Sequence, residues 1–294
     1  MLTLLVIGAL ALDRPIRLDA PLRSGGRARG RSLGGALDGR LGGGAANAGC
    51  ALLAAGHAAQ VAGLVADDAD GQRVRDLAEA AGLDLSFVRA RPGPSARTLV
   101  LIEPSGERTI IGLDFTPPTA PPALDPPPAA LDPAPDGVFV RAAFAGAGDW
   151  ARRSAGPVIL HWPSPTYDGE ADVVVASADD LPEGLADNPF ATAEAARLGE
   201  RLAWIVVTHG AAGAVAHARD GAKLAAQVPP VAVRDATGAG DVFAAGLLEA
   251  LASGAPMDEA LGHACAWGAI AAMLDGSAPV AAPAGAFRRW AEVR

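Results

Sequence analysis

The sequence has very few cysteines and lysines, and each scarcity excludes a class of site. Among 294 residues there are two cysteines, Cys50 and Cys265, which lie far apart and outside any CxxC pattern. Neither a disulfide framework nor a cysteine-bound zinc site is supported, so a reducing, cytoplasmic location is expected. The single lysine, Lys223, follows no GxxxxG pattern. A Walker-type nucleotide site is excluded, because that motif needs a lysine at the phosphates.

An excess of positive charge and a long apolar run are also missing. The chain has 24 basic and 33 acidic side chains, a net charge of -9, whereas nucleic acids and acidic membranes select basic surfaces. The apolar run at 1–12 has no basic segment before it and meets Asp13 too early to span a bilayer. We therefore expect no nucleic-acid or membrane partner. The 50% hydrophobic content supports a large core.

Short apolar runs recur along the chain with the spacing of a parallel sheet. The continuous run at 2–10 is typical of a central strand covered on both faces. Later β-branched runs, separated by potential helices, predict βα units. The predicted strands are 2–10, 60–64, 138–140, 158–160, 173–175, 205–207 and 231–233, and the predicted helices are 47–55, 70–81, 241–253 and 256–274.

Two other regions do not fit this alternation. Residues 97–103 and 107–111 predict a hairpin closed by Pro104-Ser105-Gly106. Residues 24–44 contain nine glycines and four arginines, which indicates an exposed flap. The nine prolines at 117–135 exclude a helix interior or central strand and predict a surface connection.

The segment Asp235-Ala236-Thr237-Gly238-Ala239-Gly240-Asp241 lies between a predicted strand and a strongly apolar helix. Small residues let the backbone approach a ligand, and N–H groups at a helix N-terminus bind anionic oxygen. Asp241 is either a helix-capping acid or a base held beside a phosphate. An anion-binding turn with a carboxylate at its mouth suits phosphoryl transfer to an alcohol.

A second glycine-rich segment, Gly42-Gly43-Gly44-Ala45-Ala46-Asn47, precedes a predicted helix. It is either a hinge followed by a helix cap or a site for sugar hydroxyls, to which a carboxamide offers both a donor and an acceptor. Asn47 is one of only two asparagines in the chain. Asp13, just after the first strand, adds a carboxylate acceptor.

Four other patterns carry less weight. The GxSxG match at 30–34 lacks a strand before it and a helix after it, which favours a loop. The GxGxxA match at 146–151, with Asp168 downstream, leaves a nicotinamide enzyme as an alternative. The five histidines have no metal-ligand spacing and are expected to pack or lie at the surface. The flap arginines either belong to a solvated loop or bind an anionic substrate.

The combined motifs resemble the PfkB family of carbohydrate kinases, which has a ribokinase-like fold. Residues 235–241 resemble its C-terminal signature and residues 42–47 its N-terminal one, and residues 8–13 and 66–71 also fit. The resemblance implies an α/β fold with a mostly parallel central sheet flanked by helices and a small β lid. It implies one domain over 1–294, with lid segments at about 12–41 and 97–111.

The resemblance also implies an activity: ATP-dependent phosphorylation of a hydroxyl on a small sugar or sugar-like alcohol. Asp241 would be the catalytic base, and Gly238, Ala239 and Gly240 would form the anion hole. Asp13, Gly43 and Asn47 would hold the acceptor, while Thr208, Gly210 and Gly213 would line the nucleotide site. Asp235 would bind a monovalent cation such as K⁺, which is expected to raise activity, and Asp180 would bind Mg²⁺.

Three departures from the family pattern keep alternatives open. Ala236 replaces a usual hydroxyl residue, Ala11 stands where ribokinases carry Asn, and the NxxE motif appears as Ser177 to Asp180. The alternatives are a catalytically weak sugar- or nucleotide-binding member, or a nucleoside or phosphosugar kinase. A neutral acceptor is expected, because Asp13 would repel a nearby phosphate and the arginines, Arg141 included, would serve only its far end. A homodimer stays open.

Overall fold

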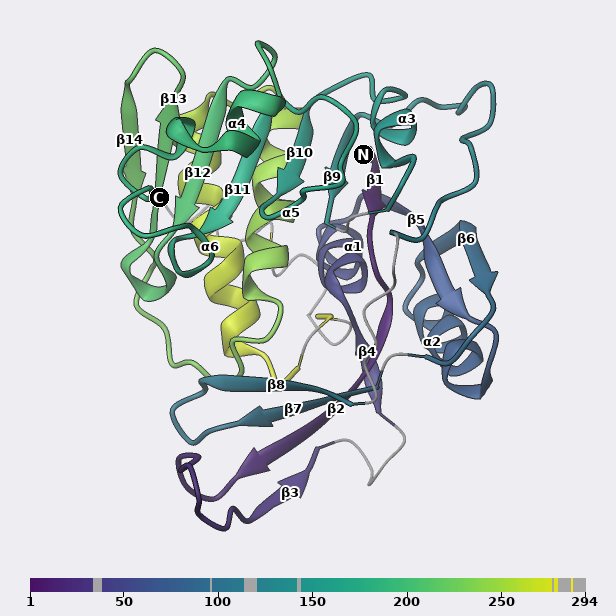
Figure 1. Ribbon diagram of the computed structural model, residues 1–294, viewed down its shortest axis with the longest axis vertical. Coiled ribbons are helices and arrows are strands. Elements are labelled where there is room, and N and C mark those ends of the chain that lie inside the picture. Colours follow the sequence, from purple (N-terminus) through teal and green to yellow (C-terminus); the bar gives the residue numbers. More distant parts are fainter. Residues whose placement is uncertain are drawn as a thin grey trace.

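The protein consists of two β-sheets and the helices that cover the larger one (Figure 1). This architecture comes from a computed structural model, which describes residues 1–33, 39–95, 97–113, 121–141, 144–276, 278–279 and 287. One sheet has nine strands and the other has five. The two sheets divide the molecule into a body and a smaller layer.

The nine-stranded sheet is parallel from β6 to β12 and ends in two antiparallel pairings, β12–β13 and β13–β14. Its inner strands are buried on both faces, which explains their uninterrupted apolar sequences. The strands, in order across the sheet, are β14 (Lys223–Ala226), β13 (Ala214–Ala218), β12 (Trp204–Thr208), β11 (Val173–Ser177), β10 (Val158–His161), β9 (Gly137–Val140), β1 (Thr3–Ile7), β5 (Ala58–Ala66) and β6 (Asp84–Arg91).

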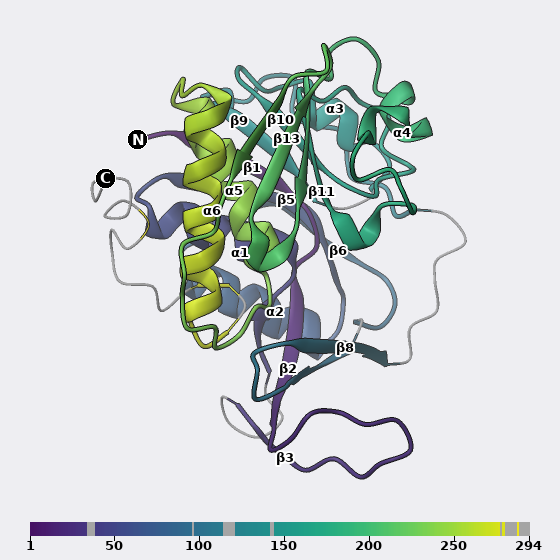
Figure 2. The ribbon, with the colours of Figure 1, turned by 90° about the vertical axis from the view of Figure 1, so that its left-hand side faces the viewer.

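Helices cover both faces of this sheet (Figure 2). Residues of α1, α2, α5 and α6 share one buried cluster, and residues of α3 and α4 belong to the other. The helices are α1 (Gly44–Ala54), α2 (Ala69–Ala80), α3 (Ala147–Ala151), α4 (Ala193–Arg197), α5 (Ala239–Ala252) and α6 (Met257–Met273), with 3₁₀ turns at Ala178–Asp180, Pro189–Ala191 and Gly210–Ala212.

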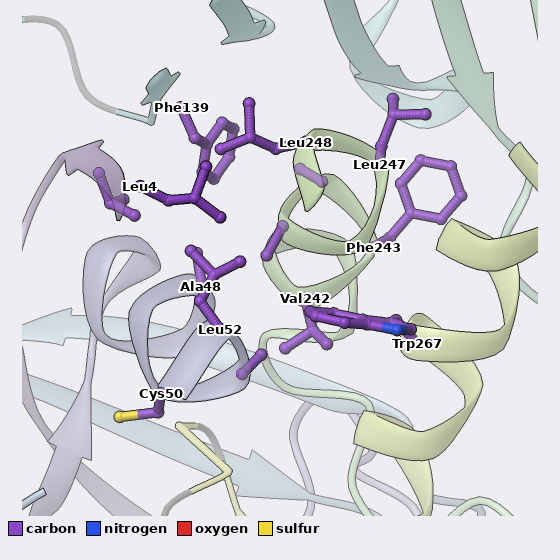
Figure 3. Close-up of a cluster of buried hydrophobic side chains, with 14 of the residues drawn as sticks. Leu4, Ala48, Cys50, Leu52, Phe139, Val242, Phe243, Leu247, Leu248 and Trp267 are labelled. Carbon is purple, nitrogen blue, oxygen red and sulfur yellow. The ribbon is translucent and has the colours of Figure 1, made fainter. Parts of the chain in front are cut away.

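The larger buried cluster fixes the position of α5 (Figure 3). Leu248 of α5 lies near Leu4 and Phe139 of the sheet in this view, all fully buried. On the opposite side α5 meets α6, where a Cβ on Gly246 would lie 2.8 Å from Cγ of Trp267. Only glycine lets the two helices approach this closely. The second half of α5 is therefore packed between the sheet and α6.

The smaller sheet lies beyond the edge where the parallel strands of the body end (Figure 1). The expected flap and hairpin supply its strands, and the hairpin prediction is confirmed by the antiparallel β7–β8 pair. The strands are β3 (Gly30–Ser32), β2 (Ala11–Leu18), β7 (Arg97–Ile102) and β8 (Arg108–Leu113), with β4 (Arg40–Gly42) paired to β2. Part of the flap, 34–38, lies outside the described residues.

The fold class is confirmed, whereas some local predictions were wrong. Residues 231–233 form no strand; prolines at 229 and 230 lack the N–H that a ladder needs. No helix connects β10 to β11. The edge strands β6 and β14, and β13 beside β14, were not anticipated. Within the described residues 121–135, the proline-rich segment contains no helix or strand beyond an isolated bridge at Ala123, as expected. No helix in the described chain is long and apolar enough to cross a membrane.

Candidate active site

Several polar residues and a glycine lie where the parallel strands of the body end. Gly8 follows β1, Arg141 follows β9, and His161 is the last residue of β10. At the ends of β11 and β12, Ser177 and Thr208 are register partners. In open α/β sheets, ligands bind outside the carboxyl ends of the strands, so this edge is the natural place for a site.

The turn before α5 depends on glycine at one position and leaves space at another. Gly238 is the N-cap of α5 with φ 77°, and no side chain caps the helix. A Cβ on Gly238 would lie 2.5 Å from Nδ2 of Asn47, so no larger residue fits. A Cβ on Gly240 would meet nothing within 4 Å. The helix N-terminus therefore faces open space beside Gly240.

Asp241 lies in the first turn of α5 and is only 7% exposed. Its Oδ2 accepts a hydrogen bond from Nδ2 of Asn47 at 2.8 Å, and its Oδ1 accepts one from Nε of Arg141. Burial raises the pKa of Asp241, but the charge of Arg141 and the hydrogen bond from Asn47 together hold it below its ordinary value. Asp241 is thus an ionised, buried carboxylate at neutral pH.

Asn47 connects three segments that are distant in sequence. It lies in α1 and donates to Asp241 of α5, while its Oδ1 accepts from the backbone N–H of Ala278 at 2.6 Å. Both ends of the carboxamide therefore bind groups of the protein itself. The sequence analysis anticipated a sugar-binding function for Asn47 but not this contribution to the orientation of Asp241.

Asp13 and the glycine segment pack tightly against each other. Asp13 lies in β2, is 8% exposed, and accepts from Oγ1 of Thr98 at 3.1 Å. A Cβ on Gly42 would collide with the Asp13 carboxylate. Gly43 is the N-cap of α1 with φ 88°. Asp13 therefore lies directly beside the glycine segment, and the part of Asp13, Gly43 and Asn47 in holding an acceptor stays a prediction.

Arg141 lies over the start of α1, where a Cβ on Gly44 would overlap its Cγ. Its backbone N–H donates to the carbonyl of Ile7 at 2.8 Å, which fixes its position between β1 and β9. The side chain remains 37% exposed. The sequence analysis assigned Arg141 to the far end of a substrate, whereas the structure pairs it with Asp241.

Asp235 is separated from Asp241 by the turn and is fully buried. Its Oδ1 accepts from the backbone N–H of Thr237 at 2.9 Å, which shapes the turn. Its Oδ2 accepts from Nη2 of Arg40 at 2.8 Å, and Arg40 belongs to β4 of the smaller sheet. This contact between the two sheets could not be predicted from the sequence.

The residues expected at the nucleotide end lie around β12. Thr208 ends this strand and donates through Oγ1 to the carbonyl of Ala176 at 3.2 Å. Gly210 is exposed with φ 56°, and a Cβ there would meet nothing within 4 Å. Gly213 has φ 101°, and a Cβ there would collide with the carbonyl oxygen of Ala226. Gly210 thus leaves room for a ligand, whereas glycine is required at 213 because the chain lies so close to Ala226.

Asp180 ends the 3₁₀ turn after β11, and its side chain is exposed. Within the described ranges, no group of three or more His, Cys, Asp or Glu side chains could hold a metal ion. A metal at this edge would therefore need oxygen ligands from a bound substrate as well, which is the usual situation for Mg²⁺ with nucleotides.

The sequence analysis missed His161, which it grouped with packing or surface histidines. Burial, reinforced by the nearby charge of Arg141, lowers the pKa of His161 to about 4, so the ring is neutral at pH 7. The electrostatic influence of both Arg141 and Asp241 shows that His161 is close to the site. Its position at the end of a predicted strand was the signal that could have found it.

The two rival motifs lack the contexts that they need. Oδ1 of Asp168 accepts from the backbone N–H of Gly148 at 3.0 Å, so the chain itself fills the turn of the GxGxxA match. The first residues of the GxSxG match form the exposed strand β3, and its last residue, Gly34, lies outside the described residues. Only the GxGxxA match lies between a strand, β9, and a helix, α3, and this helix has five residues; the next described element after the GxSxG match is the strand β4.

Similar proteins were found in sequence and in structure. The Arabidopsis thaliana ribokinase complexed with ribose and ATP has a TM-score of 0.73 and 20% identity, covering 100% of this chain and 99% of that one. A Burkholderia thailandensis nucleoside kinase in complex with inosine has a TM-score of 0.69 and 19% identity, covering 99% and 98% of the two chains. These likenesses confirm the ribokinase-like fold.

A sequence relative covers less of the chain. The bifunctional protein HldE of Bradyrhizobium diazoefficiens is 39% identical over 104 residues, which are 35% of this chain and 20% of that protein. The model of the pfkB family carbohydrate kinases matches residues 3–115 and 166–283, which include both glycine-rich segments. The chain therefore belongs to the pfkB family of carbohydrate kinases.

Proposed function

We propose that the protein transfers the γ-phosphoryl group of ATP to a hydroxyl of a small sugar or sugar-like alcohol. One observation carries this proposal: an ionised, buried carboxylate, Asp241, lies in the first turn of α5, next to Gly240 and the open space that it faces. Phosphoryl transfer depends on positioning and charge stabilisation, and this arrangement supplies both an acceptor for the hydroxyl proton and an anion-binding helix end.

Asp241 acts as the base that takes the proton of the acceptor hydroxyl. Its contacts with Arg141 and Asn47 hold the carboxylate in one orientation. They also make the carboxylate a weaker base. The reaction tolerates this because its transition state is loose and requires little deprotonation of the attacking hydroxyl before it is reached. Arg141 stabilises the ionised form and, being partly exposed, lies where it can also face the reacting groups.

Gly238, Ala239 and Gly240 form the anion hole for the transferred phosphoryl group. The first N–H groups of a helix have no acceptor within it and carry its positive dipole end. The N–H of Ala239 donates to the carbonyl of Ala236 at 3.2 Å, so Gly240 is the better-placed donor of the two. Such donors contribute most where charge develops in the transition state.

The acceptor lies between Asp13, Gly43 and Asn47, and a neutral acceptor is favoured. Arg141 is already paired with Asp241, which offsets its positive charge. The flap arginines Arg27, Arg29 and Arg31 are exposed. Asp13 would repel a phosphate close to it.

ATP binds at the end of β12, with Thr208, Gly210 and Gly213 beside it. The exposed Asp180 would hold the Mg²⁺ that accompanies the nucleotide, together with phosphate oxygens. Mg²⁺ supplies positive charge that offsets the charge on the phosphates. The smaller sheet, with residues of about 12–41 and 97–111, serves as a lid that excludes water.

A homodimer also remains a proposal. The strand β8 exposes Ile110, Ile111 and Leu113 at the edge of the smaller sheet, and exposed apolar strands favour pairing. Light scattering over a concentration series would measure the oligomeric state.

The proposed function is tested by ATP consumption with a panel of sugars, polyols, nucleosides and sugar monophosphates. Turnover with a neutral acceptor is the expected result. A kcat/KM for any sugar monophosphate well above that for every neutral acceptor would instead identify a phosphosugar kinase. ATP binding without turnover on the whole panel would identify a binding protein.

A further inference from the structure

The Asp235 carboxylate is fully buried and both of its oxygens have partners in the protein. The side chain is 0% exposed, Oδ1 accepts from Thr237 N–H, and Oδ2 accepts from Nη2 of Arg40 at 2.8 Å. A buried carboxylate is costly unless a cation or several donors compensate its charge. Arg40 provides this cation, and only 20% of its side chain is exposed.

The guanidinium is held in place from two sides. Arg40 lies in β4, where it is the register partner of Asp13 in β2. On the other side it contacts the segment after α6, because a Cβ on Gly276 would lie 2.9 Å from Nη1 of Arg40. The fixed backbone of β4 and the glycine at 276 therefore create a place for this one side chain beside Asp235.

A monovalent cation does not fit the same place. The resemblance to the family implies an ion bound by Asp235 next to the turn, but the oxygen that such an ion would use is paired with a guanidinium. A second positive charge about 4 Å from the first would be repelled. The positive charge that an ion would place beside Asp235 is already supplied by the Arg40 guanidinium.

We propose that Arg40 replaces the monovalent cation beside the anion-binding turn, so that the protein does not depend on K⁺. This inference rests on the proposed function only in that the turn before α5 is the phosphate site. Arg40 is a positioning residue: it neutralises Asp235, whose other oxygen holds the Thr237 N–H and thereby the turn. A strand of the smaller sheet thus sets the geometry of the phosphate site in the body.

The first test compares K⁺ with tetramethylammonium at equal ionic strength. It measures the Kd for Mg²⁺–ATP by calorimetry and the Tm without ligand, so no acceptor has to be known. The buried Thr237 hydroxyl has no partner within the described chain, so it is an oxygen that an ion near Asp235 could use. The wild type is therefore titrated with K⁺ directly. We expect the Kd to agree within about twofold in the two salts and the Tm to be unchanged.

The second test removes the charge with Arg40→Met and restores it with Arg40→Lys. Arg40→Met should weaken Mg²⁺–ATP binding tenfold or more in tetramethylammonium, and K⁺ should recover at least part of this loss. Arg40→Lys should stay independent of K⁺. The matched control is Arg31→Met, which removes an exposed arginine of β3 in the smaller sheet and should leave both measurements unchanged.

A Kd for the wild type that falls more than threefold in K⁺, or a Tm that rises, would overturn the inference. Equal ATP affinity of Arg40→Met and wild type in both salts would overturn it as well. If Arg40→Met does not fold, the wild-type comparison still decides. Failure of phosphoryl transfer with every acceptor would refute the proposed function. It would not change the result of the binding and stability measurements, which test the inference about Arg40 separately.

Discussion

Asp235 and Asp241 flank one turn and are both buried, yet their surroundings differ. Each is paired with an arginine from a distant segment, Arg40 in one case and Arg141 in the other. Asp235 is 0% exposed, and its two oxygens are bound by the Thr237 N–H of the turn and by Arg40. Asp241 is 7% exposed and lies next to Gly240, where a Cβ would meet nothing within 4 Å. Burial and an ion pair therefore do not distinguish the proposed base, Asp241, from Asp235, whereas access to open space does.

The comparison is tested most strongly by Asp241→Asn. The amide keeps the size of the side chain but cannot readily accept a proton, so kcat should fall roughly 10²- to 10⁴-fold while the Tm changes little. Steady-state ATP consumption with the best acceptor of the panel measures the effect. Near-normal kcat would remove Asp241 from the mechanism.

The opposite result is expected for Asp235→Asn, which should act on stability. Arg40 would keep its charge in a mostly buried place without its partner, and breaking such a pair costs about 3–5 kcal/mol of unfolding free energy. Urea denaturation measures this loss, with the exposed Asp180→Asn as control. A loss below about 1 kcal/mol would mean that the pair is solvated.

Arg141→Gln should change the pH dependence rather than the fold. Without the arginine charge, the pKa of Asp241 rises, because that charge holds it below its ordinary value. The base is then protonated at a higher pH, so the acidic limb of kcat/KM moves toward neutral pH. Arg152→Gln, which affects only an exposed pair with Asp149, is the control. An unmoved acidic limb would show that Asp241 does not set it.

The smallest effect is expected for an exposed carboxylate, Asp68. It caps α2 by accepting from the Gly71 N–H at 2.7 Å and is also bound by Ser95. Asp68→Ala should cost about 1 kcal/mol of unfolding free energy without changing kcat. The neighbouring Asp67→Ala should cost less, because it is not the capping residue. A large loss of kcat in Asp68→Ala would place this residue closer to the chemistry.

The body of the fold was predictable because its strands have strong local signals. The apolar run that contains β1 and the valine-rich runs of β9 to β12 are explained by burial on both faces. The strand β6 was missed because, at the edge of the sheet, it lacks the continuous apolar run of the inner strands, although its partial alternation is typical of a half-buried strand. The strand expected at 231–233 was wrong, because the two prolines before it carry more weight than three residues of β propensity.

The candidate site was predictable only where one segment carries the chemistry. The turn at 235–241 combines glycine and carboxylate in seven residues, so Asp241 and Gly240 could be identified together. The pair between Arg40 and Asp235 joins residues 195 positions apart. In a chain with one lysine among its 24 basic residues, no feature distinguishes Arg40 from the other arginines until the fold brings it to Asp235.

The ion pair between β2 and the segment after α6 determines how the protein responds to ionic strength. Arg17 and Arg234 both contact Asp275, whose side chain is 58% exposed. Counterions at about 1 M salt screen exposed charges beyond about 3 Å, whereas the buried pair of Arg40 and Asp235 is shielded from them. Concentrated salt should therefore weaken the contact of Arg17 with Asp275 and leave that of Arg40 with Asp235 closed, so that the smaller sheet stays attached to the turn before α5.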